Sequence, residues 1–246
     1  MTDIRRFAVL AFALVLAGQG CLSGPGAGEP ETAGGSDAEI TMGACSHQYM
    51  PLAPGSSITY RSSATGEDVT YTQSVASNAG DQASLTYTFS DNDLSLEHNI
   101  SCTPSGIFSE GYLDLNSITG GVDVTMTTRS STGPLLPEDM SVGSSWENQF
   151  VMVGTFNDPS LPVSEFVQNL DISRKVIREG RVTVPAGTYD ALVVEASFNI
   201  TSESLPVPPM SFTQTEYWVK GIGMVKTEGS SPGGGNFTTE AVSVTR

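Results

Sequence analysis

The segment that comes closest to a catalytic motif runs from Gly229 to Gly233 (GSSPG) and fits the G-x-S-x-G pattern of a hydrolase nucleophile. In that motif a helix follows the serine directly, and a histidine later in the chain activates it. Here two more glycines follow, and the chain's two histidines, His47 and His98, both precede the segment. We therefore interpret it as a loop and assign no catalytic residue.

Acidic side chains offer two further candidates, and each has a simpler interpretation. Residues 91–97 begin like a calcium loop, but this chain has Leu96 and Cys102 where the pattern requires glycine and glutamate. Glu195 stands in an otherwise apolar run, where alternation predicts that its side chain points to solvent. We expect no metal, no cofactor and no enzymatic activity. An exported hydrolase with an unrecognised site is the alternative.

Basic residues are concentrated in one short window that contains Arg174, Lys175, Arg178 and Arg181. The chain as a whole has 11 basic and 27 acidic residues, a formal net charge of −16. Nucleic acid is thereby excluded as an expected partner, because its phosphates require a basic surface. The window itself could contact lipid headgroups or an anionic ligand. Alternatively, it pairs with acidic side chains on neighbouring strands.

The N-terminus has the features of an export signal. Arg5 and Arg6 precede the apolar run Phe7 to Gly18, which is too short to span a bilayer but fits a signal peptide over residues 1–20. The run from Leu16 to Cys21 (LAGQGC) resembles a bacterial lipobox, in which the cysteine accepts lipid. Ordinary signal-peptidase cleavage after Gly20 is the alternative. We expect a lipid on Cys21 and a membrane as partner, with the domain exported to the cell envelope.

Residues 21–42 are rich in Gly, Pro, Ser, Ala and acid, so they have little to bury and are expected to form a disordered tether. If Cys21 carries lipid, the chain's other two cysteines, Cys45 and Cys102, remain as a pair in an oxidising compartment. We expect a disulfide between them. Two separate buried thiols are the alternative.

Residues 43–246 are predicted to form one all-β domain. Polar and apolar residues alternate in segments such as 84–89, 122–127 and 241–245, which is typical of antiparallel strands with one buried face. Ten to twelve strands are expected, near 56–62, 68–76, 83–90, 94–101, 106–113, 122–129, 145–154, 174–184, 188–201, 211–220, 222–228 and 236–245. We predict one large curved sheet or half-barrel. Residues 161–172 have rough helical spacing and could form a short helix or a loop.

Two sequence segments suggest that the domain consists of two similar halves. Gly55-Ser56-Ser57 and Gly143-Ser144-Ser145 each precede a large apolar residue, and they lie 88 positions apart. Either a duplication or a coincidence would explain this similarity between the two segments.

Several turn and strand-start residues resemble those of a family of exported bacterial β proteins, the TapB-like proteins. They are Tyr49 to Leu52, Cys102 with Gly106, Gly143 with Trp146, Val184 to Tyr189, and Trp218 with Gly221 to Lys226. The resemblance covers about residues 45–245, departs from the family at Ile58, where Trp is common, and implies a curved antiparallel sheet without a catalytic assignment. A curved sheet encloses space, so we expect an apolar ligand or a supporting role in the envelope.

Overall fold

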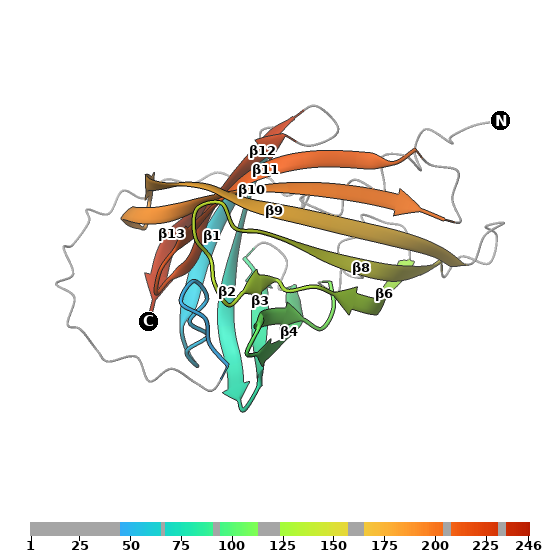
Figure 1. Cartoon of the computed structure of the whole chain (residues 1–246), viewed down its shortest axis with the longest axis horizontal. Helices are drawn as coiled ribbons and strands as arrows, with labels where there is room; N and C mark the ends of the chain where they lie inside the picture. The colour runs from blue at the N-terminus through green and yellow to red at the C-terminus, as the bar shows by residue number, and fades with distance from the viewer. Residues whose placement is uncertain are drawn as a thin grey trace.

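The computed structural model describes residues 45–64, 67–90, 94–112, 124–156, 165–203, 208–230 and 235–246. The domain is all-β, and within these residues it has thirteen strands (Figure 1). Their bounds are β1 Ser57–Ala64, β2 Glu67–Ala79, β3 Gln82–Phe89, β4 Ser95–Thr103, β5 Gly106–Ser109, β6 Val124–Thr132, β7 Leu136–Pro137, β8 Ser145–Phe156, β9 Glu165–Val184, β10 Gly187–Ser202, β11 Met210–Val219, β12 Gly223–Ser230 and β13 Asn236–Thr245.

All thirteen strands belong to one antiparallel sheet with the order β6-β8-β9-β10-β11-β12-β13-β1-β2-β3-β4-β5-β7. The last strand, β13, pairs with the first, β1, in the middle of this order. The two ends of the sheet also approach each other, because the backbone N–H of Tyr112, after β5, donates to the hydroxyl of Thr128 on β6 at 3.0 Å. The sheet therefore wraps around an interior.

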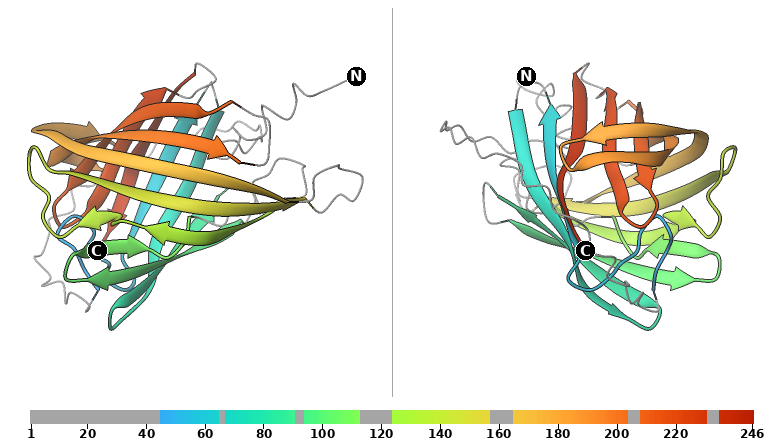
Figure 2. Two further views of the ribbon diagram at one scale, coloured as in Figure 1. Left: turned by 45° about the vertical axis from the view of Figure 1, so that its right-hand side comes forward. Right: turned by 90° about the vertical axis from the view of Figure 1, so that its left-hand side faces the viewer.

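Strand directions change along the sheet. In the left view of Figure 2, β8 to β11 run across the front of the molecule, and β12, β13, β1 and β2 cross steeply behind them. Bulges accompany this curvature, including one at Ile177 on β9, opposite Val193/Val194 of β10, and one at Val225 on β12, opposite Tyr217/Trp218 of β11. A bulge adds twist and bend to the strand that contains it. The curved sheet can thus bury one face without a helix to cover it.

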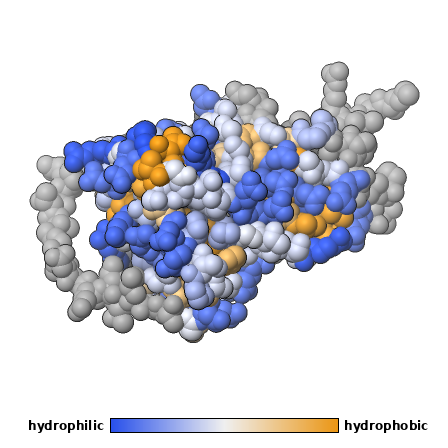
Figure 3. Space-filling model, viewed as in Figure 1, coloured by the Kyte–Doolittle hydropathy of each residue, from blue (hydrophilic) through white to orange (hydrophobic). Residues whose placement is uncertain are grey.

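Alternation of side chains selects the face that is buried. On β8 the buried and exposed residues alternate from Ser145 to Phe150, so Trp146, Asn148 and Phe150 point inward. The largest core cluster packs Trp146 and Trp218 with Val194 and other apolar residues. From outside, Figure 3 shows hydrophilic residues over much of the visible face, with apolar ones in smaller patches between them. The side chains on the inner face of the sheet are consequently the ones that can line an internal site.

The two Gly-Ser-Ser segments adopt the same turn. Gly55 and Gly143 have φ of 83° and 94°, a conformation that glycine adopts without strain. The N–H of Gly55 donates to the carbonyl of Val75 on β2, and the N–H of Gly143 donates to the carbonyl of Val176 on β9. Val75 and Val176 donate back to Ser56 and Ser144. The sequence echo therefore corresponds to matching entries into β1 and β8.

Three expectations about elements were wrong. Residues 165–172 form the first part of β9 rather than a short helix or a loop, while 161–164 lie outside the described residues. The strand expected at 106–113 ends at Ser109. The two-residue strand β7, Leu136–Pro137, was not expected, and with it the described strands number thirteen instead of ten to twelve. The described residues contain no helix that could span a bilayer.

Candidate functional site: a polar-centred internal cavity

A cavity of about 360 Å³ lies on the inner face of the sheet. Side chains from β1 to β4 and from β8 to β13 line it, together with the segment that precedes β1 and the C-terminal residues 244–246. Its volume falls within the range of about 300–1,000 Å³ that is usual for small-molecule sites. The cavity is therefore large enough to hold a ligand, and the residues that line it decide which kind.

Aromatic rings form much of the cavity wall. The rings of Tyr60 and Tyr71 stack with centroids 5.2 Å apart, and those of Phe198 and Phe212 stack at 4.6 Å. Burial raises the pKa of Tyr71 and Tyr87 well above the ordinary tyrosine value, so both hydroxyls stay protonated. The wall consequently offers flat apolar surface with hydroxyl donors at its edges.

A buried ion pair lies at the polar centre of the cavity. The Nε of Arg174 on β9 donates to both carboxylate oxygens of Glu216 on β11 at 3.2 Å. Glu216 also accepts from Gln214 Nε2 at 2.8 Å and from Trp218 Nε1 at 2.9 Å. Both charged side chains are less than 10% exposed. Because the charges cancel and the carboxylate is hydrogen-bonded on both oxygens, the pair can exist in a dry interior.

The strand between the two partners makes this pair possible. Arg174 lies opposite Ala196 on β10, and Ala196 lies opposite Gln214 on β11. Ala196 is fully buried and carries only a methyl group. The arginine side chain can therefore reach across β10 to the glutamate on the next strand, with its guanidinium carbon 6.0 Å from the centre of the Phe198 ring.

Asn148 on β8 extends the polar centre. Its Oδ1 accepts from Arg174 Nη1 at 2.7 Å, which orients the amide so that Nδ2 points elsewhere. Asn148 is 1% exposed, yet Nδ2 has no hydrogen-bond partner among the described residues. An unpaired buried donor costs about 1–3 kcal/mol. Asn148 Nδ2 is thus an unpaired donor with almost no accessible surface.

His98 on β4 is a second residue of the cavity wall that has an unpaired ring nitrogen. Its Nε2 lies 2.7 Å from the hydroxyl of Ser109, and that hydroxyl donates to the carbonyl of Gly111, so Nε2 carries the proton and donates. Burial lowers the pKa of His98 to about 4, so the ring is neutral near pH 7. Its Nδ1 is then an acceptor, and it is buried with no partner in the described part of the chain.

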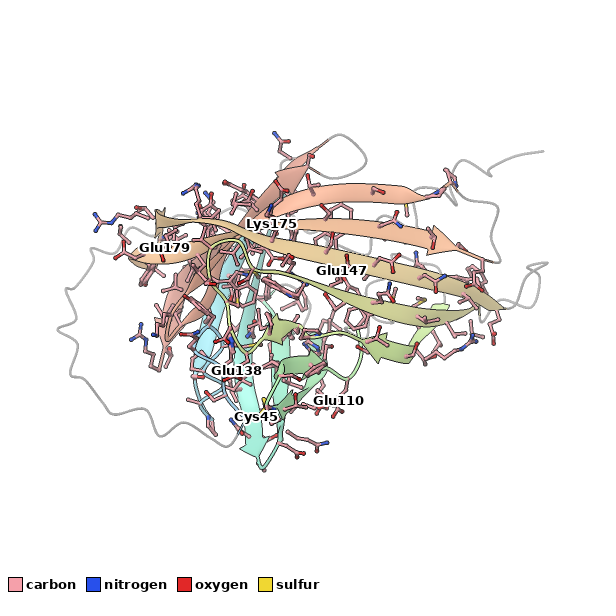
Figure 4. The ribbon with its side chains drawn as sticks, viewed as in Figure 1. Cys45, Glu110, Glu138, Glu147, Lys175 and Glu179 are labelled. Atoms are coloured by element: carbon pink, nitrogen blue, oxygen red, sulfur yellow. A yellow bond between two sulfur atoms is a disulfide. The ribbon has the colours of Figure 1, made fainter. Side chains whose placement is uncertain are left out.

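The basic window expected to form one positive stripe is divided between the two faces of β9. Arg174 is buried in the cavity, whereas Lys175, Arg178 and Arg181 are exposed. Figure 4 shows Lys175 on β9 beside Glu147 on β8, and Arg181 pairs with Asp190 at 3.6 Å on the surface. The prediction of a single four-residue contact surface was wrong for Arg174, because successive side chains of a strand point to opposite faces.

Cys45 and Cys102 form a disulfide, with their Cα atoms 5.3 Å apart. Figure 4 shows Cys45 beside the first strands of the sheet. His47, two residues on, lies 3.0 Å from the carbonyl of Pro137 on β7, so it connects the N-terminal segment to the sheet edge. The disulfide and the His47 contact both fix the N-terminal segment against the sheet, and neither holds a reacting group.

Several sequence candidates lie elsewhere. Glu195 is exposed on the outer face of β10. Cys21, Ser231, residues 91–93, the signal segment 1–20 and the tether 21–42 lie outside the described residues. No group of three or more His, Cys, Asp or Glu side chains that could hold a metal occurs within the described residues.

Sequence reasoning missed Glu216 and Asn148 as site residues. Each is a polar residue at a position where strand alternation calls for an inward side chain: Glu216 between Gln214 and Trp218, and Asn148 between Trp146 and Phe150. The same alternation would have separated Arg174 from Lys175. The signal that could have predicted these site residues was therefore a polar residue at a strand position where alternation predicts an inward side chain.

Residues 121–235 match the model of a family described as DUF3108-like. A candidate lipoprotein from Parabacteroides distasonis shares the fold with a TM-score of 0.56 and 14% identity, covering 82% of this chain and 99% of that one. A candidate exported protein with a YmcC-like fold from Bacteroides fragilis aligns with a TM-score of 0.53 and 15% identity, covering 82% and 98%. A comparison with curated proteins found no match. At these identities the likeness concerns the fold.

Proposed function

We propose that this chain is an exported, lipid-anchored protein of the bacterial cell envelope whose β domain binds an apolar ligand without catalysing a reaction. The internal cavity carries the proposal, because an apolar and aromatic chamber of about 360 Å³ is what such a ligand requires. The charged groups in the cavity support binding over catalysis: Arg174 donates to Glu216 and Asn148, and Glu216 also accepts from Trp218.

The location part of the proposal rests on the N-terminus and on the fold. The signal-like segment and the lipobox-like run before Cys21 favour export and lipid attachment. Two proteins of the same fold are themselves described as a candidate lipoprotein and a candidate exported protein. The disulfide between Cys45 and Cys102 is consistent with an oxidising compartment.

Native mass spectrometry of the purified full chain, before and after organic extraction, tests the binding function. We expect a non-covalent adduct before extraction that disappears afterwards. Thr227→Phe should reduce the adduct, because Thr227 is buried in the cavity wall and the larger ring fills the space. Thr127→Phe is the matched control, since Thr127 is exposed on β6. Equal adducts in both variants, or none in the wild type, would contradict the proposal.

A further inference from the structure

The guanidinium of Arg174 has one nitrogen that the polar centre does not use. Its Nε donates to Glu216 at 3.2 Å and its Nη1 donates to Asn148 Oδ1 at 2.7 Å, whereas Nη2 donates to no described residue. The unpaired side-chain atoms of the described residues that have almost no accessible surface are Asn148 Nδ2 and His98 Nδ1, and Nη2 is not one of them. Arg174 Nη2 is therefore an unpaired donor that retains accessible surface.

The remaining accessible surface of Arg174 faces the cavity. The side chain is 7% exposed, and Arg174 lines the cavity from the inner face of β9. The centre of the Phe198 ring lies 6.0 Å from its guanidinium carbon. Burial raises the pKa of Tyr112, and the positive charge of Arg174 opposes part of this rise, which places Tyr112 close to the guanidinium as well. Both aromatic residues line the cavity, so the free N–H group lies beside apolar surface.

The polar centre has no net charge, and this decides between neutral and anionic ligand groups. The charges of Arg174 and Glu216 cancel each other, and Arg246, the other arginine that lines the cavity, is exposed. A carboxylate that accepted from Nη2 would share one guanidinium with the carboxylate of Glu216. It would also bring an uncompensated charge into a largely apolar chamber, which costs free energy. A neutral acceptor avoids this cost.

From these observations we infer that the cavity binds a neutral acyl ester, such as a fatty-acid methyl ester or an acylglycerol, whose carbonyl oxygen accepts a hydrogen bond from Arg174 Nη2. The hydrocarbon chain lies against the aromatic wall that includes Tyr71 and Phe198. Arginine donates hydrogen bonds and cannot accept them, so the group on Nη2 must be an acceptor. An ester carbonyl is the neutral acceptor that is common in lipids. The inference rests on the proposed function and narrows its ligand class.

Isotope-edited infrared spectroscopy of methyl octanoate tests the contact on the wild-type cavity. The full chain carrying Cys21→Ser, purified without detergent, is held in excess over the ester, which is labelled with carbon-13 at its carbonyl. We expect the C=O band of the bound ester at a lower wavenumber than the band of the same ester in an alkane, because a hydrogen bond from a cation weakens the C=O bond. A bound ester with the band position of the alkane solution would overturn the inference.

A double variant assigns the donor. Arg174→Met/Glu216→Leu removes Nη2 and leaves no buried charge unpaired. It should bind methyl octanoate about tenfold more weakly than the wild-type cavity does, and it should bind 1-chlorodecane, which has no carbonyl, with unchanged affinity. Tryptophan fluorescence follows both titrations, because Trp218 lines the cavity. The C=O band of the ester should return to its alkane position.

Glu195→Leu on the exposed face of β10 is the matched control and should change the affinity for neither probe. Circular-dichroism melting of each variant verifies folding. An unchanged affinity and an unchanged C=O band of the ester in the folded double variant would refute Arg174 as the donor.

Nonanoate tests the preference for a neutral group on the wild-type cavity. It is ionised at pH 7.5, so we expect it to bind about tenfold more weakly than methyl octanoate. Equal or tighter binding of nonanoate would overturn the preference for an ester.

The outcomes separate this inference from the proposed function. If 1-chlorodecane binds but the ester makes no hydrogen bond to Arg174, the ester assignment is wrong and the ligand-binding function stands. If neither probe binds and the purified chain carries no extractable adduct, the ligand-binding function itself is wrong. A ligand extracted from the purified chain should contain an ester, and an extract without one would also overturn the inference.

Discussion

At the scale of single residues, the carboxylate of Glu216 is held by hydrogen bonds from three side chains. It balances the charge of Arg174 and accepts from Gln214 and Trp218, so its removal leaves one buried cation and two buried donors without a partner. Breaking a buried pair from one side is far more costly than replacing both partners by apolar groups. The stability of the inner face therefore depends on this residue more than on an exposed acid of the same strands.

Glu216→Leu is accordingly expected to lower the free energy of unfolding by about 3–5 kcal/mol, measured by urea denaturation. The double variant Arg174→Met/Glu216→Leu should recover most of that loss, because no charge is then stranded. Glu195→Leu on the exposed face of β10 is the control and should change stability by less than about 0.5 kcal/mol. If Glu216→Leu were no more harmful than Glu195→Leu, the ion pair would have no structural role.

The burial of His98 leads to a pH dependence of the free energy of unfolding. Burial lowers the pKa of His98 from 6.5 in the unfolded chain to about 4 in the folded one. Between these values the unfolded chain binds a proton that the folded chain does not, so stability falls as the pH falls from 6.5 to 4. From pH 7 to pH 5 the contribution of this residue is a loss of about 2 kcal/mol.

Urea denaturation of the wild type and of His98→Phe at pH 7, 6 and 5 measures that contribution by difference, because the carboxylates are common to both proteins. The wild type should lose more stability on acidification than the variant. Parallel pH profiles for the two proteins would show that His98 does not titrate in the expected range.

At the scale of elements, the strand positions followed from alternation wherever the inner face was apolar. The start of β9 escaped prediction because Gln168 occupies an inward position there and because Phe166 and Val167 are adjacent, so the apolar residues are spaced as in a helix. The sequence did not predict β7 because a strand of two residues is too short to show an alternation. The polar centre of the cavity forms because Arg174, Glu216 and Asn148 come together from three strands. Their contact depends on the order of the strands in the sheet, which cannot be derived from a single sequence.

The disulfide makes the segment before β1 part of the domain. Cys45 is bonded to Cys102 on β4, and the side chain of Asn78 on β2 donates to the carbonyls of Cys45 and Leu52. The segment also lines the cavity at Leu52. Loss of the bridge would consequently release a part of the cavity wall together with the point at which the chain enters the domain.

Reduction of this bridge is expected to lower the free energy of unfolding by about 4 kcal/mol, because it closes a loop with a sequence separation of 57 residues. Urea denaturation of the Cys21→Ser chain with and without a reductant isolates the effect, since only Cys45 and Cys102 then remain. Peptide mapping without reduction identifies the pair directly. Two free thiols in that map, or an unchanged denaturation midpoint, would disprove the role assigned to the bridge.

At the scale of the whole molecule, negative charge predominates. The formal net charge of the whole chain is −16, whereas the charges of Arg174 and Glu216 in the cavity cancel each other. Exposed acids disfavour association with anionic surfaces and keep the chain soluble. The membrane attachment that we propose is therefore assigned to the N-terminal cysteine. Cys21 precedes Cys45 by 24 residues, a length that spans roughly 80 Å when fully extended.

We therefore expect Cys21 to carry the membrane anchor. Radiolabelled fatty acid should enter the wild-type protein and the Cys45→Ser/Cys102→Ser variant but not Cys21→Ser, because a lipobox-like run precedes only Cys21. After cell fractionation the wild type should be found with the membrane, and Cys21→Ser should be found with the soluble exported proteins. The Cys45–Cys102 disulfide should persist in Cys21→Ser, which shows that this variant is still exported. Equal labelling of the wild type and Cys21→Ser would overturn the lipid anchor, and a reduced, cytoplasmic Cys21→Ser would show that Cys21 serves export rather than attachment.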